Sequence, residues 1–276
     1  MFKRILVTTD GSDAASIGVN YAVALAAHTG ARVVGLHVVD VKLLEGPFLQ
    51  DVSAALGTAP FVNAQNNISM ILEERGQVAL QAVQDHCAAQ NIECATKQVS
   101  GVVHRAIAEE AELADLVVMG RGGEHDAWLE GVIGSTTESV VRRSIRPVLV
   151  TGQPEPRFER CVVAYDGSQQ AREALHTSVA IALQWKMAIN VLTVGEEGVF
   201  AKLEEAQAYL SSHGVNAEYA QKNGDPGESI VQYAESTGAS LLLMGAFGHS
   251  KLREWILGST TLFALNRAAC PVLLTR

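Results

Sequence analysis

Residues 3–12 read KRILVTTDGS, and residues 159–168 read ERCVVAYDGS. Each stretch is a short apolar run that stops at Asp-Gly-Ser, as a buried strand does where it leads into a turn. Three further blocks recur in the same order: LVVMGRGG at 116–123 with LLLMGAFG at 241–248, GSTT at 134–137 and 258–261, and PVL at 147–149 and 271–273. Four matched blocks in one order predict the internal duplication of a single domain.

The duplication predicts two domains, at 1–153 and 158–276, joined by the polar, Pro- and Gly-containing stretch 151–156. The first copy carries an insertion of about thirty residues between roughly Val41 and Gly76. Loop signals run through this insertion: Gly46-Pro47, Gly57, Pro60 and Asn66-Asn67. Such a segment is more often a surface excursion or a short-helix cap than a catalytic element, so we expect it to cover the protein's own fold.

Apolar runs alternate with helical patterns in each copy. Strands are expected at 3–9, 32–39, 93–98, 115–119 and 147–150, with helices near 13–29, 68–90, 104–113 and 134–144. This alternation implies βαβ crossovers and a parallel sheet, and the nearly all-apolar strands indicate helices on both faces. Ligands of such α/β sheets bind at the carboxyl ends of the strands.

Composition narrows the classes of partner. The 276 residues have a formal net charge of −9, which argues against nucleic acid because phosphate backbones attract clusters of Lys and Arg. A small phosphorylated ligand stays allowed, since backbone N–H groups hold phosphate without net positive charge. The chain begins directly with a strand and has no apolar run of transmembrane length, so we expect a cytoplasmic protein with no membrane partner.

No metal centre is indicated by the cysteines and histidines. The four cysteines form no CxxC pair and are interpreted as small buried hydrophobes: Cys87, Cys94, Cys161 and Cys270. The histidines are scattered, and those such as His37 and His104 are assigned mostly to packing or solvent.

An aspartate ends the first strand of each copy, at Asp10 and Asp166. One interpretation is helix capping, because Asp-Gly-Ser before a helix supplies an acceptor to orphan N–H groups. The other is a carboxylate at the ligand crevice that accepts hydrogen bonds from a ribose or a base. Both interpretations are compatible if the hydroxyls of Ser12 and Ser168 cap the helices.

A glycine-rich turn follows the fourth strand of the second copy, where Met244 leads into Gly245-Ala-Phe-Gly248-His249. Glycine after a strand allows a positive φ and the close approach of a ligand to the backbone. Gly258-Ser259-Thr260 then opens the next helix, whose N-terminus favours a phosphate. A tight turn with an ordinary N-cap is the alternative, and an exposed loop position is at least as good an interpretation of His249.

The run GxxG, nine residues, then G-S resembles the ATP-binding signature of the universal stress protein family, and the strand-ending aspartates and Gly224-Asp225-Pro226 are similar to that family too. The resemblance covers nearly the whole chain. It implies two tandem Rossmann-like domains similar to adenine-nucleotide α-hydrolase-like domains, each a five-stranded parallel sheet. It also implies ATP or a related adenine nucleotide as ligand, with Mg²⁺ brought by the nucleotide.

The resemblance implies roles for particular residues. Asp166 would contact the adenosine, and Val194 would meet the base or ribose through its backbone. The phosphate-binding set in the second copy would be Gly245, Gly248, Gly258, Ser259 and Thr260, with Met244 and His249 beside them. The matching residues of the first copy are Asp10, Val38, Gly120, Gly123, Gly134, Ser135 and Thr136.

The first copy departs from this pattern. Ten residues rather than nine separate Gly123 from Gly134, and the loop holds Glu124, Asp126 and Glu130. Arg121 is the one cation in the sequence close to this turn, whereas the second copy has Lys251 and Arg253. Carboxylates near phosphates are unfavourable, so the second copy is ranked as the main nucleotide site.

The chain has no Walker motif and no GxSxG elbow, which favours a binding module over an efficient enzyme. The leading hypothesis is a nucleotide-dependent signalling or protective module in the stress response. A scaffold that works by protein contacts without nucleotide, and a slow ATPase, are the alternatives.

The resemblance also implies an assembly. Domains of this family commonly pair through their last strands, here 147–150 and 271–275, so tandem fusion would make an intramolecular pseudo-dimer. The apolar edges at 148–150 and 272–274 need cover, which favours a further homodimer.

Overall fold

A computed structural model describes residues 2–45, 61–123, 133–152, 155–196, 198–246 and 257–276. The first half runs in the order β1 (Arg4–Thr8), α1 (Asp13–Thr29), β2 (Arg32–Asp40), α2 (Val41–Glu45), α4 (Phe61–Ala89), β3 (Cys94–Gly101), α5 (Val103–Ala111), β4 (Leu116–Gly120), α6 (Ser135–Arg143) and β5 (Val148–Thr151). The second half runs in the order β6 (Arg160–Ala164), α7 (Gln169–Gln184), β7 (Ala188–Val194), α8 (Val199–Ser212), β8 (Ala217–Lys222), α9 (Pro226–Ser236), β9 (Leu241–Gly245), α10 (Ser259–Arg267) and β10 (Val272–Thr275).

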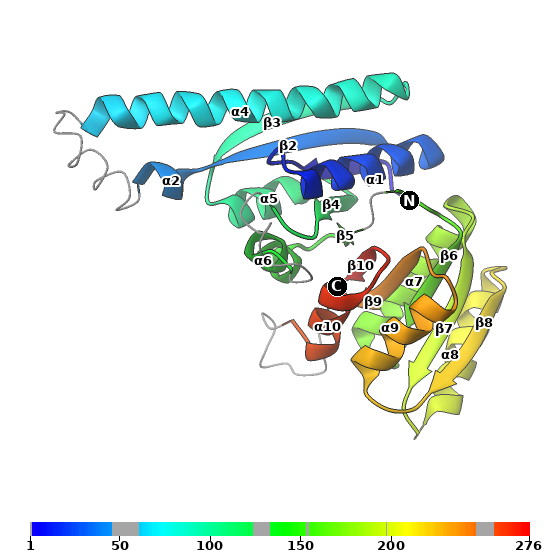
Figure 1. Cartoon of the computed structure of the whole chain (residues 1–276). Helices are drawn as coiled ribbons and strands as arrows, with labels where there is room; N and C mark the ends of the chain where they lie inside the picture. Colours follow the sequence, from blue (N-terminus) through cyan, green and yellow to red (C-terminus); the bar gives the residue numbers. More distant parts are fainter. Residues whose placement is uncertain (1, 46–60, 124–132, 153–154, 197, 247–256) are drawn as a thin grey trace.

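The strands of both halves form one ten-stranded sheet in the order β3-β2-β1-β4-β5-β10-β9-β6-β7-β8 (Figure 1). Every pairing within a half is parallel, and each half contributes five strands. Each half therefore has the predicted doubly wound α/β architecture, with strand order 3-2-1-4-5.

Helices cover both faces of the sheet, and this explains why its strands are apolar throughout. One buried cluster joins side chains of α1, α4, α7 and α8 to the sheet, and a second joins side chains of α5, α6, α9 and α10 to the opposite face. Both clusters contain residues of the two halves, so the hydrophobic core continues across the junction between them.

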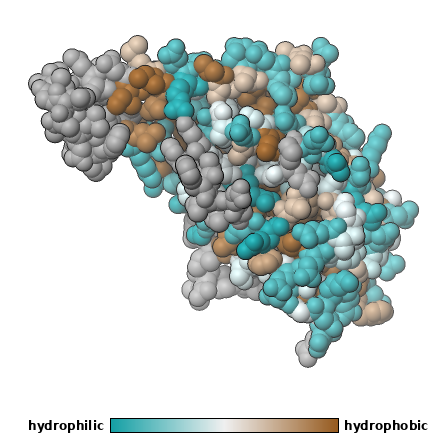
Figure 2. Space-filling model, viewed as in Figure 1, coloured by the Kyte–Doolittle hydropathy of each residue, from teal (hydrophilic) through white to brown (hydrophobic). Residues whose placement is uncertain are grey.

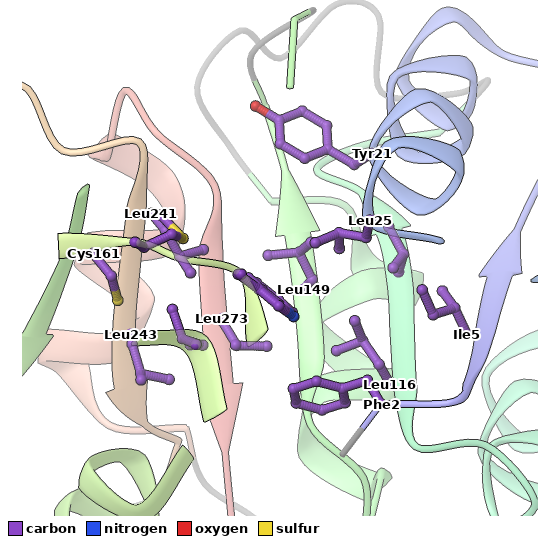
Figure 3. Close-up of a cluster of buried hydrophobic side chains, with 14 of the residues drawn as sticks. Phe2, Ile5, Tyr21, Leu25, Leu116, Leu149, Cys161, Leu241, Leu243 and Leu273 are labelled. Atoms are coloured by element: carbon purple, nitrogen blue, oxygen red, sulfur yellow. The ribbon is translucent and has the colours of Figure 1, made fainter. Parts of the chain in front are cut away.

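The junction is an antiparallel pairing of the two last strands. Leu149 of β5 stands opposite Leu273 of β10, with Val150 opposite Val272 and Val148 opposite Leu274. The register is symmetric about Leu149 and Leu273, and Figure 3 shows these two side chains within the buried cluster. The predicted pairing through the last strands is confirmed. The same finding removes the argument for a further homodimer, because the two edges cover each other.

The insertion in the first copy differs from the prediction. Its start forms α2, and α4 begins at Phe61 instead of near residue 68, so Asn66-Asn67 lies inside a helix and not in a loop. Gly76 lies in this helix, as expected for 68–90. Glycine and asparagine lower helix propensity by at most about 1 kcal/mol each, which the packing of α4 on β2 and β3 outweighs. The loop signals at Gly46-Pro47, Gly57 and Pro60 fall outside the described residues.

Among the described residues, no helix has both the length and the apolar character that crossing a membrane requires.

Candidate functional site

The turn after the first strand has the same construction in both halves. The hydroxyl of Ser12 accepts a hydrogen bond from Ala15 N (3.2 Å) and caps α1, and Ser168 caps α7 in the same way. Asp10 Oδ1 accepts from Ser12 N at 3.0 Å, and Asp166 Oδ1 accepts from Ser168 N at 2.9 Å. The serines take the cap, as the sequence allowed, and the carboxylates are fixed beside the carboxyl ends of β1 and β6.

Gly120 and Gly245 end β4 and β9, and the structure corrects the reason for these glycines. They are absent from the positive-φ residues of the described chain. A Cβ on Gly120 would lie 2.4 Å from the carbonyl oxygen of Ala14, and one on Gly245 would lie 2.6 Å from Gln170 Cβ. The close packing of the first turn of α1 or α7 on the strand end is therefore enough to require glycine, and a positive φ is not the reason.

The helix after the glycine turn is held against the strand end. Gly134 is the N-cap of α6, with φ −63°, and its N–H donates to the carbonyl of Arg121 at 2.9 Å. The hydroxyl of Thr137 donates to the carbonyl of Gly120 at 3.1 Å. These contacts place the first turn of α6, with Ser135 and Thr136, at the carboxyl end of β4. Gly258 has the same role for α10, with φ −62°.

The first half contains a cavity of about 300 Å³ at this edge of the sheet. It lies between the ends of β1, β2 and β4 and the start of α6. The predicted residues that line it are Asp10, Val38, Gly120, Gly123, Ser135 and Thr136. Gly134, the seventh residue of the predicted set, does not line the cavity and is the N-cap of α6. Positions that are far apart in the sequence are thus brought to one cavity.

The lining of this cavity combines two kinds of chemistry. Leu36, Val103 and Ile107 give one part an apolar wall. Ser135 and Thr136 lie in the first turn of α6, where helix N–H groups and the positive end of the helix dipole favour an anion. The cavity suits a ligand with a flat apolar part and an anionic part.

The sequence-based prediction omitted two lining residues and gave a third a different role. His37, which was assigned to packing or solvent, lines the cavity, and its Nδ1 is 2.9 Å from the carbonyl oxygen of Thr9. Leu72 and Arg75 come from α4, so the insertion supplies part of the wall. Nothing in the sequence gives the register of that helix against β2, so no local signal could have assigned them.

The charges around the cavity also differ from the sequence interpretation. Arg121 does not line it: its guanidinium donates to the carbonyl of Ala268 in the second half at 2.7 Å. Arg75 is the cation that lines the wall, together with the carboxylates of Asp10 and Asp40. Desolvation, and then the nearby Arg143, lower the pKa of His104 at the start of α5. The loop carboxylates at 124, 126 and 130 lie outside the described residues.

The second half places its predicted residues in the equivalent positions. Asp166 follows β6, Val194 ends β7, Met244 and Gly245 end β9, and Ser259 opens α10 after Gly258. Thr260 lies in the first turn of α10, where the hydroxyl of Thr261 donates to the carbonyl of Gly245 at 3.4 Å. Gly248 and His249 lie outside the described residues.

The two candidate sites are linked through α10. Its N-terminal end carries Gly258, Ser259 and Thr260, and its C-terminal end accepts the hydrogen bond from Arg121. Asn266, in its last turn, accepts a hydrogen bond from Ile133 N at 2.7 Å, just before the first-half cap. One helix thus contacts the glycine turn of the first half and opens the candidate site of the second.

A doubly wound parallel sheet, with an aspartate, a glycine turn and a helix N-terminus at the carboxyl ends of its strands, defines a Rossmann-like α/β protein. The sequence model described as "Universal stress protein family" matches residues 1–152 and 157–276, so the chain belongs to this family.

Individual relatives cover different parts of the chain. Universal stress protein Slr1230 of Synechocystis sp. is 27% identical over 286 residues, spanning 99% of this chain and 100% of that protein. Universal stress protein MJ0531 of Methanocaldococcus jannaschii is 33% identical over 158 residues, spanning 56% of this chain and 85% of that protein. The crystal structure of a universal stress protein from Archaeoglobus fulgidus has a TM-score of 0.81 at 20% identity, with 99% of this chain and 98% of that chain covered. This likeness supports the two-domain fold.

Proposed function

We propose that this universal stress protein binds ATP or a related adenine nucleotide at the carboxyl ends of its strands and acts as a nucleotide-dependent signalling or protective module. The observation that carries the proposal is the first-half cavity, because six separately predicted residues line it together. Its volume of about 300 Å³ is at the lower end of small-molecule pockets.

The lining suggests how the nucleotide lies. The base fits the apolar wall beside Leu36 and Ile107, with Asp10 and the backbone of Val38 near the adenosine. The phosphates fit the first turn of α6, where Ser135 and Thr136 add hydroxyl donors to the backbone N–H groups. Arg75 of α4 also lines the cavity and supplies positive charge. Mg²⁺ would come with the nucleotide: no group of three His, Cys, Asp or Glu side chains suited to a metal occurs in the part of the chain that is described.

The second half is proposed as the main site. Its complete GxxG-nine-GS pattern and its loop cations Lys251 and Arg253 support this ranking. Asp166, Val194, Ser259 and Thr260 would have the roles of Asp10, Val38, Ser135 and Thr136. The cation contributed by Arg75 is a reason to test the first half as a second site and not to set it aside.

A fluorescent ATP analogue, titrated with Mg²⁺ into the full chain, tests the proposal. Arg75→Ala should weaken first-half binding by about tenfold, because one cation near the phosphates is lost. Arg32→Ala is the matched control, because Arg32 lies at the amino-terminal end of β2, away from the cavity at the carboxyl ends of the strands. This variant should leave binding unchanged. Equal effects of both variants, or no binding by the folded chain, would remove the first-half site. Steady phosphate release that Asp166→Ala abolishes would replace the binding module with an ATPase.

A further inference from the structure

A second hollow in the first half adjoins the candidate nucleotide cavity. It has a volume of about 740 Å³, lies between α1 and α4, and shares Thr9, Asp10 and Arg75 with that cavity. We call it the α1–α4 trough. Its apolar wall is formed by Val19, Ile71, Val78, Ala79, Ala82 and Val83. The trough is larger than the cavity beside it and lies within the usual size range of small-molecule sites.

Part of this wall is exposed on one face of α4. The side chain of Ile71 is 55% exposed and that of Val78 is 68% exposed. They are seven residues apart, so they lie on the same side of the helix two turns from each other. Figure 2 shows hydrophobic residues gathered on the surface where Figure 1 places α2 beside the first half of α4. Exposed aliphatic side chains that line a hollow favour an apolar occupant.

In the second half, two side-chain contacts cross the equivalent space between α7 and α8. There Arg172 of α7 forms an ion pair with Glu205 of α8, with Nε and Oε1 2.6 Å apart. One turn further along both helices, the rings of His176 and Tyr209 stack with centroids 4.8 Å apart. Two side-chain bridges therefore span the gap between α7 and α8.

The first half has other residue types at these four positions. Ser16 stands four residues after the cap Ser12, as Arg172 stands four after the cap Ser168. The helices α4 and α8 align through their ends, because Asn91 and Gly214 both have a positive φ and both lie three residues before the start of the next strand.

This alignment places Ala82 at the position of Glu205. It likewise places Asn20 at the position of His176, and His86 at that of Tyr209. The ion pair of the second half is thus replaced by Ser16 and Ala82, both too short to reach across. All four first-half residues line the trough.

We propose that the α1–α4 trough is a ligand site for an uncharged small molecule with an apolar body and one or two hydroxyl or amide groups. The apolar wall takes the body, and Ser12, Ser16 and Asn20 of α1 offer polar groups along the other side. The carboxylates of Asp10 and Glu74 outnumber the guanidinium of Arg75, so the lining does not favour an anion. The site does not depend on nucleotide binding. Because both sites share Asp10 and Arg75, a trough ligand would change nucleotide affinity, and the reverse.

The test transfers the bridge of the second half into the first. The uncharged fluorescent probe N-phenyl-1-naphthylamine is titrated into the full chain, into Ser16→Arg/Ala82→Glu, and into the control Lys97→Ser/Glu110→Ala, which removes the ion pair between Lys97 and Glu110. Closing the trough should weaken probe binding by about tenfold or more, since the apolar wall is covered. The control changes a surface ion pair outside the trough and should bind like the unaltered chain. Unchanged binding by the closed variant, or equal losses in both, overturns the proposal.

A single substitution tests the same site in case the double variant does not fold. Val78→Glu puts a charge on an exposed side chain of the trough, and Leu183→Glu does so at a similarly exposed position on α7. The probe should lose affinity only for Val78→Glu, and the NMR signals of Ser16 and Asn20 should shift when the probe is added. A loss of the same size for Leu183→Glu, or no shift of those signals, contradicts a trough site.

Discussion

The guanidinium of Arg121 in the first half donates a hydrogen bond to the carbonyl of Ala268 in the second, at 2.7 Å. Ala268 is the C-cap of α10, where the negative end of the helix dipole favours a cation. The guanidinium also rests on Gly152, where an added Cβ would be 2.8 Å from it. Burial lowers the pKa of Arg121. A residue expected near phosphate from its place in the glycine turn therefore joins the two halves.

Arg121→Ala removes this link. Hydrogen bonds made by charged groups contribute about 1.5–3 kcal/mol, so we expect the free energy of unfolding to fall by about that amount. Urea denaturation followed by circular dichroism measures it. Arg32→Ala removes an exposed arginine at the start of β2 and should change the free energy of unfolding little. If both variants lose the same stability, the contact with Ala268 contributes nothing specific.

Leu149→Ala tests whether the two halves fold as one unit. Leu149 is 1% exposed and faces Leu273 at the centre of the junction, so its truncation should cost about 2–5 kcal/mol. Because the core continues through this point, both halves should lose stability together in a single transition. Leu183→Ala is the exposed control. Two separate transitions, with only the first shifted, would show that the halves unfold independently.

Gly120→Ala separates packing from ligand binding. Its added Cβ would lie 2.4 Å from backbone atoms of α1, so we expect a loss of about 1–3 kcal/mol even without nucleotide. Gly258→Ala is the comparison, because its nearest contact would be 3.8 Å away and its φ is −62°. Thermal unfolding of both variants without ligand measures the difference. Equal stability would return Gly120 to the ligand-binding role that the sequence suggested.

Alkaline pH should destabilise the fold through its buried thiols. Burial, and then a hydrogen bond with Cys94, raise the pKa of Cys87 from 9.0 to about 12, and burial raises that of Cys270 to about 11. Below pH 9 both states hold these protons. Above it the unfolded chain loses them first, so stability falls as the pH rises from 9 toward 11 or 12.

Urea midpoints measured from pH 7 to 11 follow this loss. Each thiol contributes a slope of about 1.4 kcal/mol per pH unit, which Cys87→Ala should remove for its own site. An identical slope in that variant would contradict the assignment.

Much of the fold could be predicted from the sequence, because its signals are local. The Asp-Gly-Ser turns that Ser12 and Ser168 cap, and the apolar strands before them, depend on residues adjacent in the chain. The duplication then predicted the domain order, and the family resemblance implied the pairing of the last strands. The first turns of α4 could not be predicted, since Asn66-Asn67 indicates a loop when tertiary packing is ignored. A Cβ on Gly76 would lie 2.4 Å from His37, so the glycine within the predicted helix is explained by its contact with β2.

The candidate site was predictable to the same extent. Residues at strand ends and helix starts, such as Asp10 and Ser135, follow from the βα pattern. Arg75 could not be found, because its position depends on how an inserted helix crosses the sheet. The position of the Arg121 side chain also could not be predicted, because it depends on a contact with Ala268 in the other half. No sequence pattern within one copy indicates such a contact.

Calorimetric titration of ATP with Mg²⁺ into the nucleotide-free chain tests the central claim most directly, alongside Gly123→Val, Gly248→Val and the double variant. A side chain at Gly123 would put its Cβ 2.8 Å from Asp10 Oδ2, inside the first-half cavity. Gly248 is chosen from the GxxG pattern. We expect micromolar binding whose main part is lost in Gly248→Val, a weaker part lost in Gly123→Val, and none in the double variant. No binding by the folded chain, or undiminished binding by the double variant, would contradict nucleotide binding at these strand ends.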